Sequence, residues 1–351
     1  MEICMISGQC PGPCVFPPTF DAHRQLKLRQ FCCCYSSDGK THSSPVASRM
    51  FIFGVGFVGK FFAAELKMEG WDISGTCTSV SKKKELQHMG LETFLFNAED
   101  HDLNCLPRLQ DTSHLLISIP PISGLGDPLL GLYRDLLRSK LSNGKLQWLS
   151  YLSTTSVYGD TGGAWVDENC PVKASSESAK ARLVAEEGWL ELGRALGVPA
   201  YVFRLGGIYG PGRSAVDTII KQQTLTKNQR NRESTKFTSR VHVADICQVL
   251  KACINKPSLS GGVYNVVDDD PTPRVEVFEF AREMLKEKWP GEMAKSLPSP
   301  VTDFIHKKDD YKGEKRVSNA LMKRELGIKL LHPTYRSGLR SIAESLHNPF
   351  P

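Results

Sequence analysis

The fold of this 351-residue chain is decided by the stretch Met50-Phe-Ile-Phe-Gly54-Val-Gly56-Phe-Val-Gly59-Lys60. Four apolar residues run directly into a Gly-x-Gly-x-x-Gly pattern, and apolar residues at helical spacing follow it, namely Phe61, Phe62, Ala63, Ala64 and Leu66. This order predicts a buried strand, a tight turn and the start of a helix. Gly54 permits the turn, Gly56 leaves the backbone open to a close neighbour, and Gly59 lets the helix pack against the strand.

The start of this helix is typical of a dinucleotide site. Backbone N–H groups in the first turn of a helix have no partner within it, and the helix dipole is positive there, so a pyrophosphate fits. We therefore assign Gly54, Gly56, Phe57, Val58 and Gly59 to cofactor binding. The alternative is a glycine-rich turn in an ordinary α/β protein.

The composition is that of a soluble globular protein with one large domain or two. Hydrophobic residues make up 40% of the chain and charged residues 23%, which are ordinary values. A net charge of +6 is too mild to imply nucleic acid by itself. No run of 18 apolar residues occurs, because prolines and glycines interrupt Leu115 to Tyr133, so we expect no membrane span.

The eleven cysteines are distributed unevenly. Six lie in the first 34 residues and five are scattered through the rest, a pattern that favours reduced thiols in a non-secretory compartment. Cys10 and Cys14 with the run at 32–34 could form a metal site, but no histidine stands beside them at ligand spacing. We predict no metal.

Residues 1–48 precede the predicted first strand and show no hydrophobic periodicity. They are rich in Pro, Ser and Cys and lack the apolar core of a secretory signal. We interpret them as a disordered organellar transit peptide, with the chloroplast as first choice and the mitochondrion or the cytoplasm as alternatives. A disordered cytosolic tail or a mispredicted gene start would look similar.

The second strand, predicted over 71–78, bears on the choice of cofactor. A site that prefers NAD has Asp or Glu about twenty residues past the glycines, where it holds the ribose hydroxyls. This chain has Thr78 at that place, and Lys82, Lys83 and Lys84 follow. A missing carboxylate with nearby positive charge favours NADP, although NAD is possible and the lysines could simply begin a solvated helix.

Further strands are predicted at 91–96, 115–119 and 146–153, and they alternate with helical patterns. This alternation predicts an α/β fold with a doubly wound parallel Rossmann sheet and a smaller C-terminal substrate lobe. Ligands in such sheets lie at the carboxyl ends of the strands. We therefore add Thr78, Ser118, Ile119 and Pro120 to the crevice that the glycine stretch opens.

Five later segments resemble the extended short-chain dehydrogenases/reductases, the NAD-dependent epimerase/dehydratase group. They occur in the family's order and are Ser153–Gly159, Arg204–Arg213, Arg240–Asp245, Gly262–Val267, and Lys315–Asn319 with Glu325–Gly327. The resemblance covers roughly residues 50–345 and is greatest for the atypical YeeZ-like proteins of bacteria and plastids. It implies an NAD(P)-binding domain over 49–212, completed by about 240–268, and a substrate lobe over 213–239 and 269–351.

The resemblance also implies a catalytic trio. Ordinary members use a Ser or Thr hydroxyl, a Tyr phenol and a Lys four residues after the Tyr. Thr154 matches the hydroxyl, but Ser178 stands at the tyrosine and Arg182 at the lysine. A serine is a poor proton donor at neutral pH, and arginine stays charged, so Arg182 can bind ribose but cannot relay protons. Sliding the register to Lys180 does not restore the phenol.

Another side chain could take the place of the missing phenol as proton donor, or the site could lack such a donor. Tyr158, Tyr209 and Glu177 are candidates, although a packed structural aromatic is the first interpretation of each tyrosine. His242 and Asp245 match a family position that usually supports structure, as does Arg204. Leu205 and Gly206, at the end of the sixth strand, join the cofactor residues that the resemblance implies.

The C-terminal segments leave the partner open. The region 213–240 contains six cations with only Phe237 as an aromatic, a weak signal for nucleic acid. It fits a solvated loop or a contact with an anionic substrate better. Amphipathic patterns at Val275–Trp289 and Ser318–Leu326 predict packing helices. The oligomeric state cannot be read from the sequence.

Two functions follow from these observations. The first is an NAD(P)-dependent oxidoreductase, epimerase or dehydratase that acts on a small hydroxylated metabolite through a degenerate Tyr/Lys site. The second is a non-catalytic NAD(P)-binding sensor or scaffold. The glycine stretch and Thr154 favour the first, whereas Ser178 and Arg182 favour the second.

Overall fold

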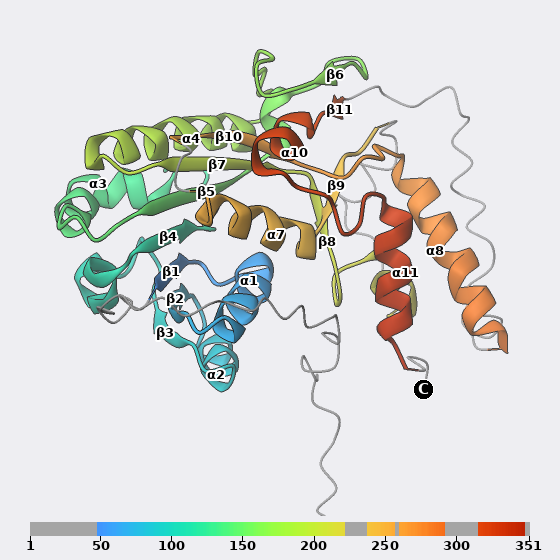
Figure 1. The fold of residues 1–351 in the computed structure, drawn as a ribbon, viewed down its shortest axis with the longest axis horizontal. Helices are drawn as coiled ribbons and strands as arrows, with labels where there is room; N and C mark the ends of the chain where they lie inside the picture. Colours follow the sequence, from blue (N-terminus) through green and yellow to red (C-terminus); the bar gives the residue numbers. More distant parts are fainter. Residues whose placement is uncertain (1–47, 222–236, 257–259, 292–314, 348–351) are drawn as a thin grey trace, which may run out of the picture. The chain divides into compact units, whose positions relative to one another are not determined.

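A parallel sheet of seven strands forms the centre of the computed structural model, which describes residues 48–221, 237–256, 260–291 and 315–347 (Figure 1). Its strands, in spatial order, are β10 (Gly261–Val266), β7 (Ala200–Leu205), β5 (Trp148–Thr154), β4 (His114–Ile117), β1 (Arg49–Phe53), β2 (Asp72–Cys77) and β3 (Glu92–Leu95). Every neighbouring pair is parallel. The order reverses direction between β1 and β4, so the predicted doubly wound sheet is confirmed.

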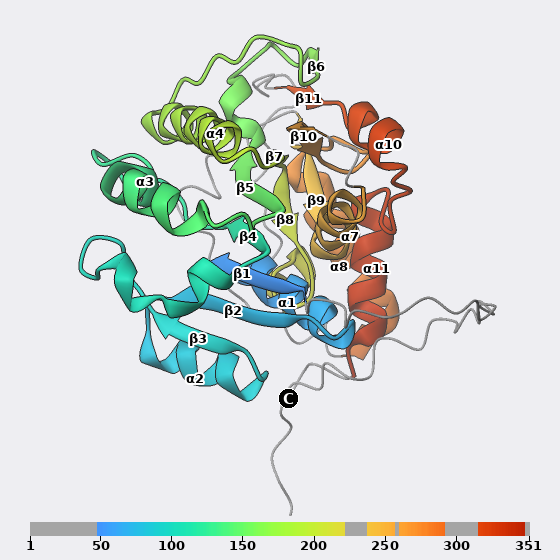
Figure 2. The same ribbon diagram turned by 60° about the vertical axis from the view of Figure 1, so that its left-hand side comes forward.

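Helices cover both faces of this sheet. They are α1 (Phe57–Met68), α2 (Val80–His88), α3 (Pro128–Leu141), α4 (Glu177–Leu196) and α7 (Val243–Ile254). Figure 2 shows α3 and α4 on one side of the sheet and α7 on the other. No helix in the described ranges is both long and apolar enough to cross a membrane.

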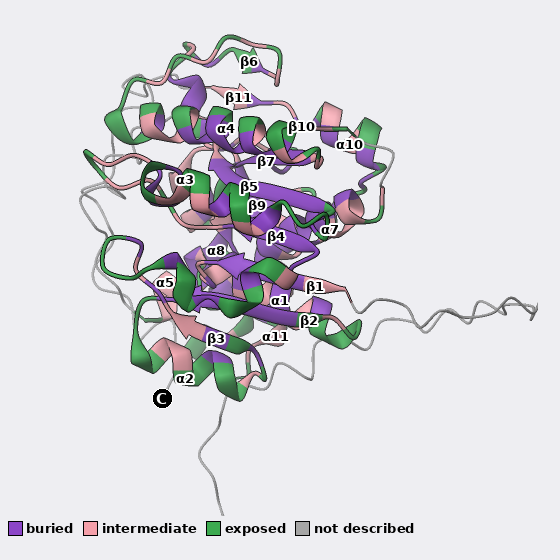
Figure 3. Cartoon of the chain, turned by 90° about the vertical axis from the view of Figure 1, so that its left-hand side faces the viewer, coloured by how far each residue is buried: buried purple, intermediate pink, exposed green. Residues whose placement is uncertain are grey.

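The position of β1 between two cores explains why residues 50–53 form a continuous apolar run. Met50 and Ile52 point into the core beneath α1 and α7, whereas Phe51 and Phe53 point into the core beneath α3 and α4. A strand that is buried on both faces must be apolar at every position. The inner strands β1, β4, β5 and β7 are accordingly almost entirely buried, while the edge strands β3 and β10 are less so and α2, α3 and α4 keep an exposed side (Figure 3).

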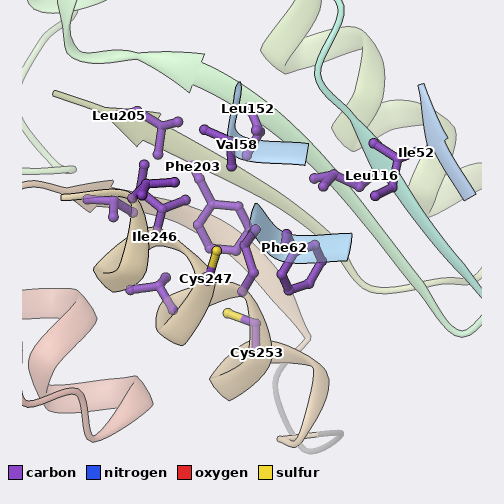
Figure 4. Packing of buried hydrophobic residues seen from close by; sticks show 14 of the residues in the cluster. Ile52, Val58, Phe62, Leu116, Leu152, Phe203, Leu205, Ile246, Cys247 and Cys253 are labelled. Atoms are coloured by element: carbon purple, nitrogen blue, oxygen red, sulfur yellow. The ribbon is translucent and has the colours of Figure 1, made fainter. Parts of the chain in front are cut away.

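The core beneath α1 and α7 joins the glycine stretch to the later strands. Val58 and Phe62 of α1 pack there with Phe203 of β7 and with Ile246 and Cys247 of α7 (Figure 4). Cys77, Cys247 and Cys253 are free and buried. The segment that begins at Gly56 is therefore anchored by its apolar side chains.

A separate cluster of helices follows the sixth and seventh strands of the sheet. It contains α5 (Ala215–Ile220), α8 (Arg274–Lys288) and α11 (Tyr335–Ser345), which share a core around Val216, Ala281, Leu285 and Leu339. The helix predicted at Val275–Trp289 is α8, displaced by one residue. The helix predicted from Ser318 is α10 (Ala320–Leu326) and begins two residues later. The proposed domain bounds stay a prediction.

Two short sheets lie outside the sequence-based expectations. One pairs β8 (Gly207–Tyr209) with β9 (Arg240–His242), and the other pairs β6 (Trp165–Val166) with β11 (Arg316–Val317). Arg316 lies over the rings of Trp165 and Phe237, with its guanidinium carbon 5.3 and 4.9 Å from their centroids. Both sheets join segments that are far apart in the sequence.

Nearly all of the proposed transit peptide lies outside the described residues, and so do Cys10, Cys14 and the cysteines at 32–34. The basic segment of the substrate lobe is described only up to residue 221 and again from residue 237. The predictions for those segments stay predictions.

Candidate functional site

The glycine stretch forms the turn between β1 and α1, and its geometry distinguishes the roles of the three glycines. Gly54 has a φ of +79°, and an added Cβ would lie 3.0 Å from Cγ1 of Ile119. On Gly59 a Cβ would lie 3.4 Å from Cγ2 of Ile52, so the helix packs closely on the strand. On Gly56 the nearest atom would be a backbone oxygen 3.8 Å away. Packing within the chain therefore does not require glycine at 56, whereas a ligand pressed against the backbone would.

The buried end of β2 holds the turn in place. The Gly54 N–H donates to Oγ1 of Thr76 at 2.8 Å, and the Val55 N–H donates to the Thr76 carbonyl at 2.8 Å. Thr76 is 1% exposed. These bonds satisfy the amides that point inward and leave the first turn of α1 facing outward.

The start of α1 suits an anion. Gly56 is its N-cap, and among the described side chains none caps the helix and no acidic residue lies in its first turn. The Phe57 ring lies against Phe61, with centroids 5.2 Å apart, and the Arg213 guanidinium carbon is 5.4 Å from its centroid. The unpaired N–H groups and the helix dipole therefore face a region that also contains a cation.

Residues beyond β4 form another border of this crevice. The Ser118 N–H donates to the Phe53 carbonyl at 2.9 Å, and Ile119 packs against Gly54. Pro120 is exposed. The structure thus brings Ser118 and Ile119 beside the glycine turn. β4 ends at Ile117 rather than at Ile119 as expected, because the chain turns away there.

The end of β2 lacks a carboxylate at the ribose position. Thr78 is exposed, and Ser79 caps α2 by accepting from the Lys82 N–H at 3.3 Å. Burial raises the pKa of the Cys77 thiol, and the charges of Lys82 and Lys83 act in the opposite direction. Those two ammonium groups therefore lie near the end of β2, where a 2′-phosphate would need positive charge.

Thr154 and Arg182 lie at the end of β5, and Ser178 lies one turn before Arg182 on α4. Thr154 is the last residue of β5, and its hydroxyl accepts from the Ser156 N–H at 3.2 Å. Arg182 donates to the Leu152 carbonyl at 2.7 Å from its place on α4. Ser178 is exposed in the first turn of α4. Arg182 is therefore held against β5 by its Nη1 bond. Its role at the lysine position stays a prediction.

Tyr158 cannot supply the missing phenol, because a buried polar network holds its hydroxyl. It donates to Oδ1 of Asn265 at 2.9 Å and accepts from Nη1 of Arg204 at 2.9 Å. Arg204 in turn pairs with Glu186 at 2.8 Å, and Ser153 also donates to Glu186. Tyr158 is 0% exposed. The interpretation of Tyr158 and Arg204 as structural residues agrees with this geometry.

His242 and Asp245 also hold structure together. The Asp245 carboxylate accepts from the backbone N–H groups of Leu331 and His332 at 2.6 and 3.2 Å. Nδ1 of His242 accepts from the Ala244 N–H at 3.2 Å, and its ring lies 4.1 Å from that of His332. Burial lowers the pKa of His242 to about 3 and raises that of Asp245 to about 6. The histidine therefore stays neutral in neutral solution.

A cavity of about 320 Å³ lies between β8, β9, α5, α8 and α11. Its polar or charged lining includes Tyr209, Arg213, Ser214, Asp217, Thr218, Lys221, Thr238, Arg240 and Arg274. Gly210 connects it to the cofactor side, because an added Cβ there would lie 3.3 Å from Cζ of Phe57. The sequence indicated cations between 213 and 240, but it gave no sign that Arg274 would join Arg240, since helix periodicity alone does not show which distant segments meet.

Metal ligation finds no support in the described part of the chain. No group of three or more His, Cys, Asp and Glu side chains there could hold an ion. The described cysteines are single and unpaired with one another.

Comparisons with known proteins agree with this arrangement. The model of the NAD dependent epimerase/dehydratase family matches residues 132–266. The protein YeeZ of Escherichia coli K12 is 26% identical over 287 residues, which are 80% of this chain and 95% of YeeZ. A solved structure of a functionally unknown conserved protein from Silicibacter pomeroyi DSS is 33% identical, covering 85% of this chain and 99% of its own, with a TM-score of 0.66.

A further solved structure shows the same fold at lower identity. The UDP-glucuronic acid 4-epimerase from Bacillus cereus, in complex with NAD, is 16% identical over 84% of this chain and 97% of its own. Its TM-score is 0.63. At this identity the likeness concerns the fold alone.

Proposed function

The chain belongs to the NAD-dependent epimerase/dehydratase family, and from this premise we propose that it binds a nicotinamide dinucleotide across the carboxyl ends of β1, β2 and β4. The pyrophosphate would lie on the N–H groups of Phe57 and Val58. Ser118 and Ile119 would border the nicotinamide half. Thr78 with Lys82 and Lys83 would hold the adenosine ribose, which favours NADP, with NAD as the second choice.

One observation carries this proposal, namely the open side of Gly56. Gly54 and Gly59 each have neighbours within 3.4 Å of an added Cβ, whereas at Gly56 no atom of the described residues is closer than 3.8 Å. The packing of the described residues does not require glycine at position 56. A ligand that contacts the backbone there would explain the missing side chain.

Gly56→Asp tests the proposal. The carboxylate would stand where the pyrophosphate approaches, so we expect NADPH binding to fall beyond detection in a calorimetric titration. Gly291→Asp is the matched control, because no atom of the described residues lies within 4 Å of its Cβ position. Unchanged NADPH affinity in Gly56→Asp would contradict the cofactor site as proposed.

We further propose that the protein is an oxidoreductase, epimerase or dehydratase for a small hydroxylated metabolite. A bound nicotinamide would supply hydride transfer. The Thr154 hydroxyl at the end of β5 would orient a substrate oxygen, and the Arg182 guanidinium would hold ribose. Ser178 would leave the proton step without a phenol, so turnover would be slow or would depend on a group of the substrate.

The alternative is an NAD(P)-binding sensor or scaffold without turnover, and the Tyr158 network favours it. The tyrosine after β5 is bonded to both Asn265 and Arg204 and has no exposed surface. A screen that follows NADPH absorbance with hydroxylated metabolites, ketones and sugar nucleotides would separate the two. Nucleotide binding without oxidation by any class would support the sensor.

We also propose that the N-terminal segment directs the chain to the chloroplast. Its composition supports this, and residues 1–47 lie outside the described structure. A fusion of residues 1–48 to a fluorescent protein should accumulate in chloroplasts, whereas one carrying residues 49–351 should not. Diffuse cytosolic fluorescence of the first fusion would overturn the proposal.

A further inference from the structure

The cavity between β8, β9, α5, α8 and α11 has a marked excess of positive charge. Four of its lining side chains are cations, Arg213, Lys221, Arg240 and Arg274. Asp217 is the acidic lining residue, and the Ser214 hydroxyl donates to its carboxylate. A cavity with this lining attracts anions.

Arg240 is the deepest of these cations and is only partly satisfied. It is 8% exposed, and Nη2 donates to the Thr272 carbonyl at 2.8 Å. Its Nη1 is buried without a hydrogen-bond partner in the described part of the chain. The guanidinium lies 5.6 Å from the ring of Tyr335, another lining residue. A buried guanidinium nitrogen without an acceptor is costly, and a ligand oxygen would remove that cost.

Tyr209 provides a second unused donor in the same lining. It is 8% exposed, and its hydroxyl also has no hydrogen-bond partner among the described atoms. Its ring lies against Gly338 of α11, where an added Cβ would be 2.2 Å from the hydroxyl oxygen. The phenol therefore has little freedom to turn away, and two residues that each carry a buried, unused donor line one cavity.

A simpler explanation for the buried charge of Arg240 is that carboxylates of the protein itself neutralise it. Asp268 is buried, and its charge and that of Asp270 act on the guanidinium. Asp270, however, pairs with Arg336 at 2.6 Å. No salt bridge within 4.0 Å joins Arg240 to any carboxylate of the described residues, and Asp268 also leaves one carboxylate oxygen unpaired. Arg240 and Asp268 thus do not form a hydrogen-bonded salt bridge as Arg204 and Glu186 do.

We propose that this cavity binds the carboxylate or phosphate group of a small hydroxylated metabolite, with Arg240 and Tyr209 as its innermost contacts and Arg213 and Arg274 at its mouth. The inference rests on the proposed function, because it names the substrate class for the same protein. The volume of about 320 Å³ is at the lower end of small-molecule sites. It fits a single-ring or short-chain anion better than a complete nucleotide sugar.

The position of Arg213 connects this anion to the cofactor side. Its side chain lines the cavity, and its guanidinium carbon lies 5.4 Å from the centroid of the Phe57 ring in the glycine turn. A substrate anchored by its anion at Arg240 could therefore extend toward the dinucleotide crevice. The aromatic lining of Phe278 and Tyr335 would contact its uncharged part.

The test compares ligands that differ only in charge. Glucose, glucuronate and glucose 6-phosphate are titrated calorimetrically into the full chain with saturating NADPH and without it, and UDP-glucuronate is titrated beside them. We expect at least one of the two small anions to bind ten or more times tighter than glucose, with an affinity that falls as salt rises. Equal affinities, or no heat from either small anion at millimolar concentration, would overturn the inference.

Variants assign the contacts. Tyr209→Phe and Arg274→Gln should each weaken binding of the anion several-fold, and Arg240→Lys should weaken it tenfold or more. Arg194→Gln, an exposed arginine on α4, should have no effect. Tyr209→Phe keeps the ring that packs on Gly338, so it remains informative if Arg240→Lys fails to fold. Unchanged anion affinity in both Tyr209→Phe and Arg274→Gln would contradict the site.

Failure of this inference differs from failure of the cofactor proposal. Gly56→Asp should remove NADPH binding and leave anion binding in place. NADPH binding without anion binding would defeat only the present inference, and the reverse would defeat only the cofactor site. UDP-glucuronate binding tighter than both small anions and dependent on Arg240 would show a nucleotide-sugar site instead and would also overturn it.

Discussion

The glycine turn and the end of β5 border the same edge of the sheet, but they are built differently. The turn is made of backbone, with inward amides bonded to Thr76 and outward amides that have no partner among the described residues. The end of β5 depends on side chains from α4, where we predict that Ser178 and Arg182 stand at the family's tyrosine and lysine positions. A site made of backbone survives as long as its glycines do, whereas a site made of side chains is lost by two substitutions. The contrast predicts that nucleotide binding and proton transfer can be separated in one fold.

The largest effect should come from the network behind β5, which we regard as structural. Arg204→Met leaves Glu186 buried and unpaired, so the free energy of unfolding should fall by about 3–5 kcal/mol. Urea unfolding followed by circular dichroism would measure it. NADPH affinity of the folded fraction should stay the same, since the Arg204 guanidinium is bonded to Glu186 and Tyr158.

A second substitution controls for that result. Arg204→Met combined with Glu186→Leu should recover part of the lost stability, because no buried charge remains. If Arg204→Met instead left stability intact and removed turnover, the network would be catalytic. The end of β5 would then have kept catalytic side chains, contrary to the comparison with the glycine turn.

Thr76→Val tests how far the backbone site depends on its one supporting hydroxyl. The variant leaves the Gly54 N–H without its acceptor, so we expect a loss of about 1–3 kcal/mol in stability and weaker NADPH binding. Thr93→Val on β3 is the matched control, because Thr93 is also buried but bonds locally to the Leu91 carbonyl. Equal effects of the two substitutions on NADPH affinity would show that Thr76 has no special role in the turn.

Lys82→Gln with Lys83→Gln sharpens the cofactor assignment. If these ammonium groups face a 2′-phosphate, NADPH affinity should fall about tenfold, or about 1.4 kcal/mol, while NADH affinity barely changes. Lys84→Gln is the control, because Lys84 is exposed on the same helix whereas Lys82 and Lys83 are half-buried. Tighter binding of NADH than of NADPH by the unaltered protein would contradict the proposed preference for NADP.

The smallest effect is expected from restoring the family's pair. Ser178→Tyr with Arg182→Lys should change NADPH affinity only a few-fold, because the glycine turn is untouched. Fluorescence titration measures the affinity, and the metabolite screen shows whether turnover appears. Loss of nucleotide binding would mean that Ser178 and Arg182 do not occupy the tyrosine and lysine positions.

The sequence predicted those parts of the molecule that depend on local pattern. The apolar run at Met50 and the glycines after it are contiguous, so β1, the turn and α1 could be read directly. Helix α3 begins at Pro128, because Asp127 accepts from the N–H groups of Leu129 and Leu130 at 3.0 Å. The sequence signal for this start is local as well, since Asp-Pro combines a capping residue with proline at the first helical position.

The parts that could not be predicted depend on segments that meet only in the folded chain. Strands β6 and β11 are two residues long and about 150 residues apart, too short for any periodicity to appear. Asn265, which holds Tyr158, is 107 residues away from it. The cavity likewise combines four separate segments, so Arg240 and Arg274 could be counted as cations but not placed together.

The two-sided burial of β1 has a mechanical consequence. Met50 and Ile52 belong to one core, and Phe51 and Phe53 belong to the other, so neither layer of helices can detach without exposing the strand that leads into the turn. The two layers should therefore melt together in a single cooperative transition. Amide hydrogens of this strand should exchange with deuterated water only through global opening, more slowly than those at either edge of the sheet.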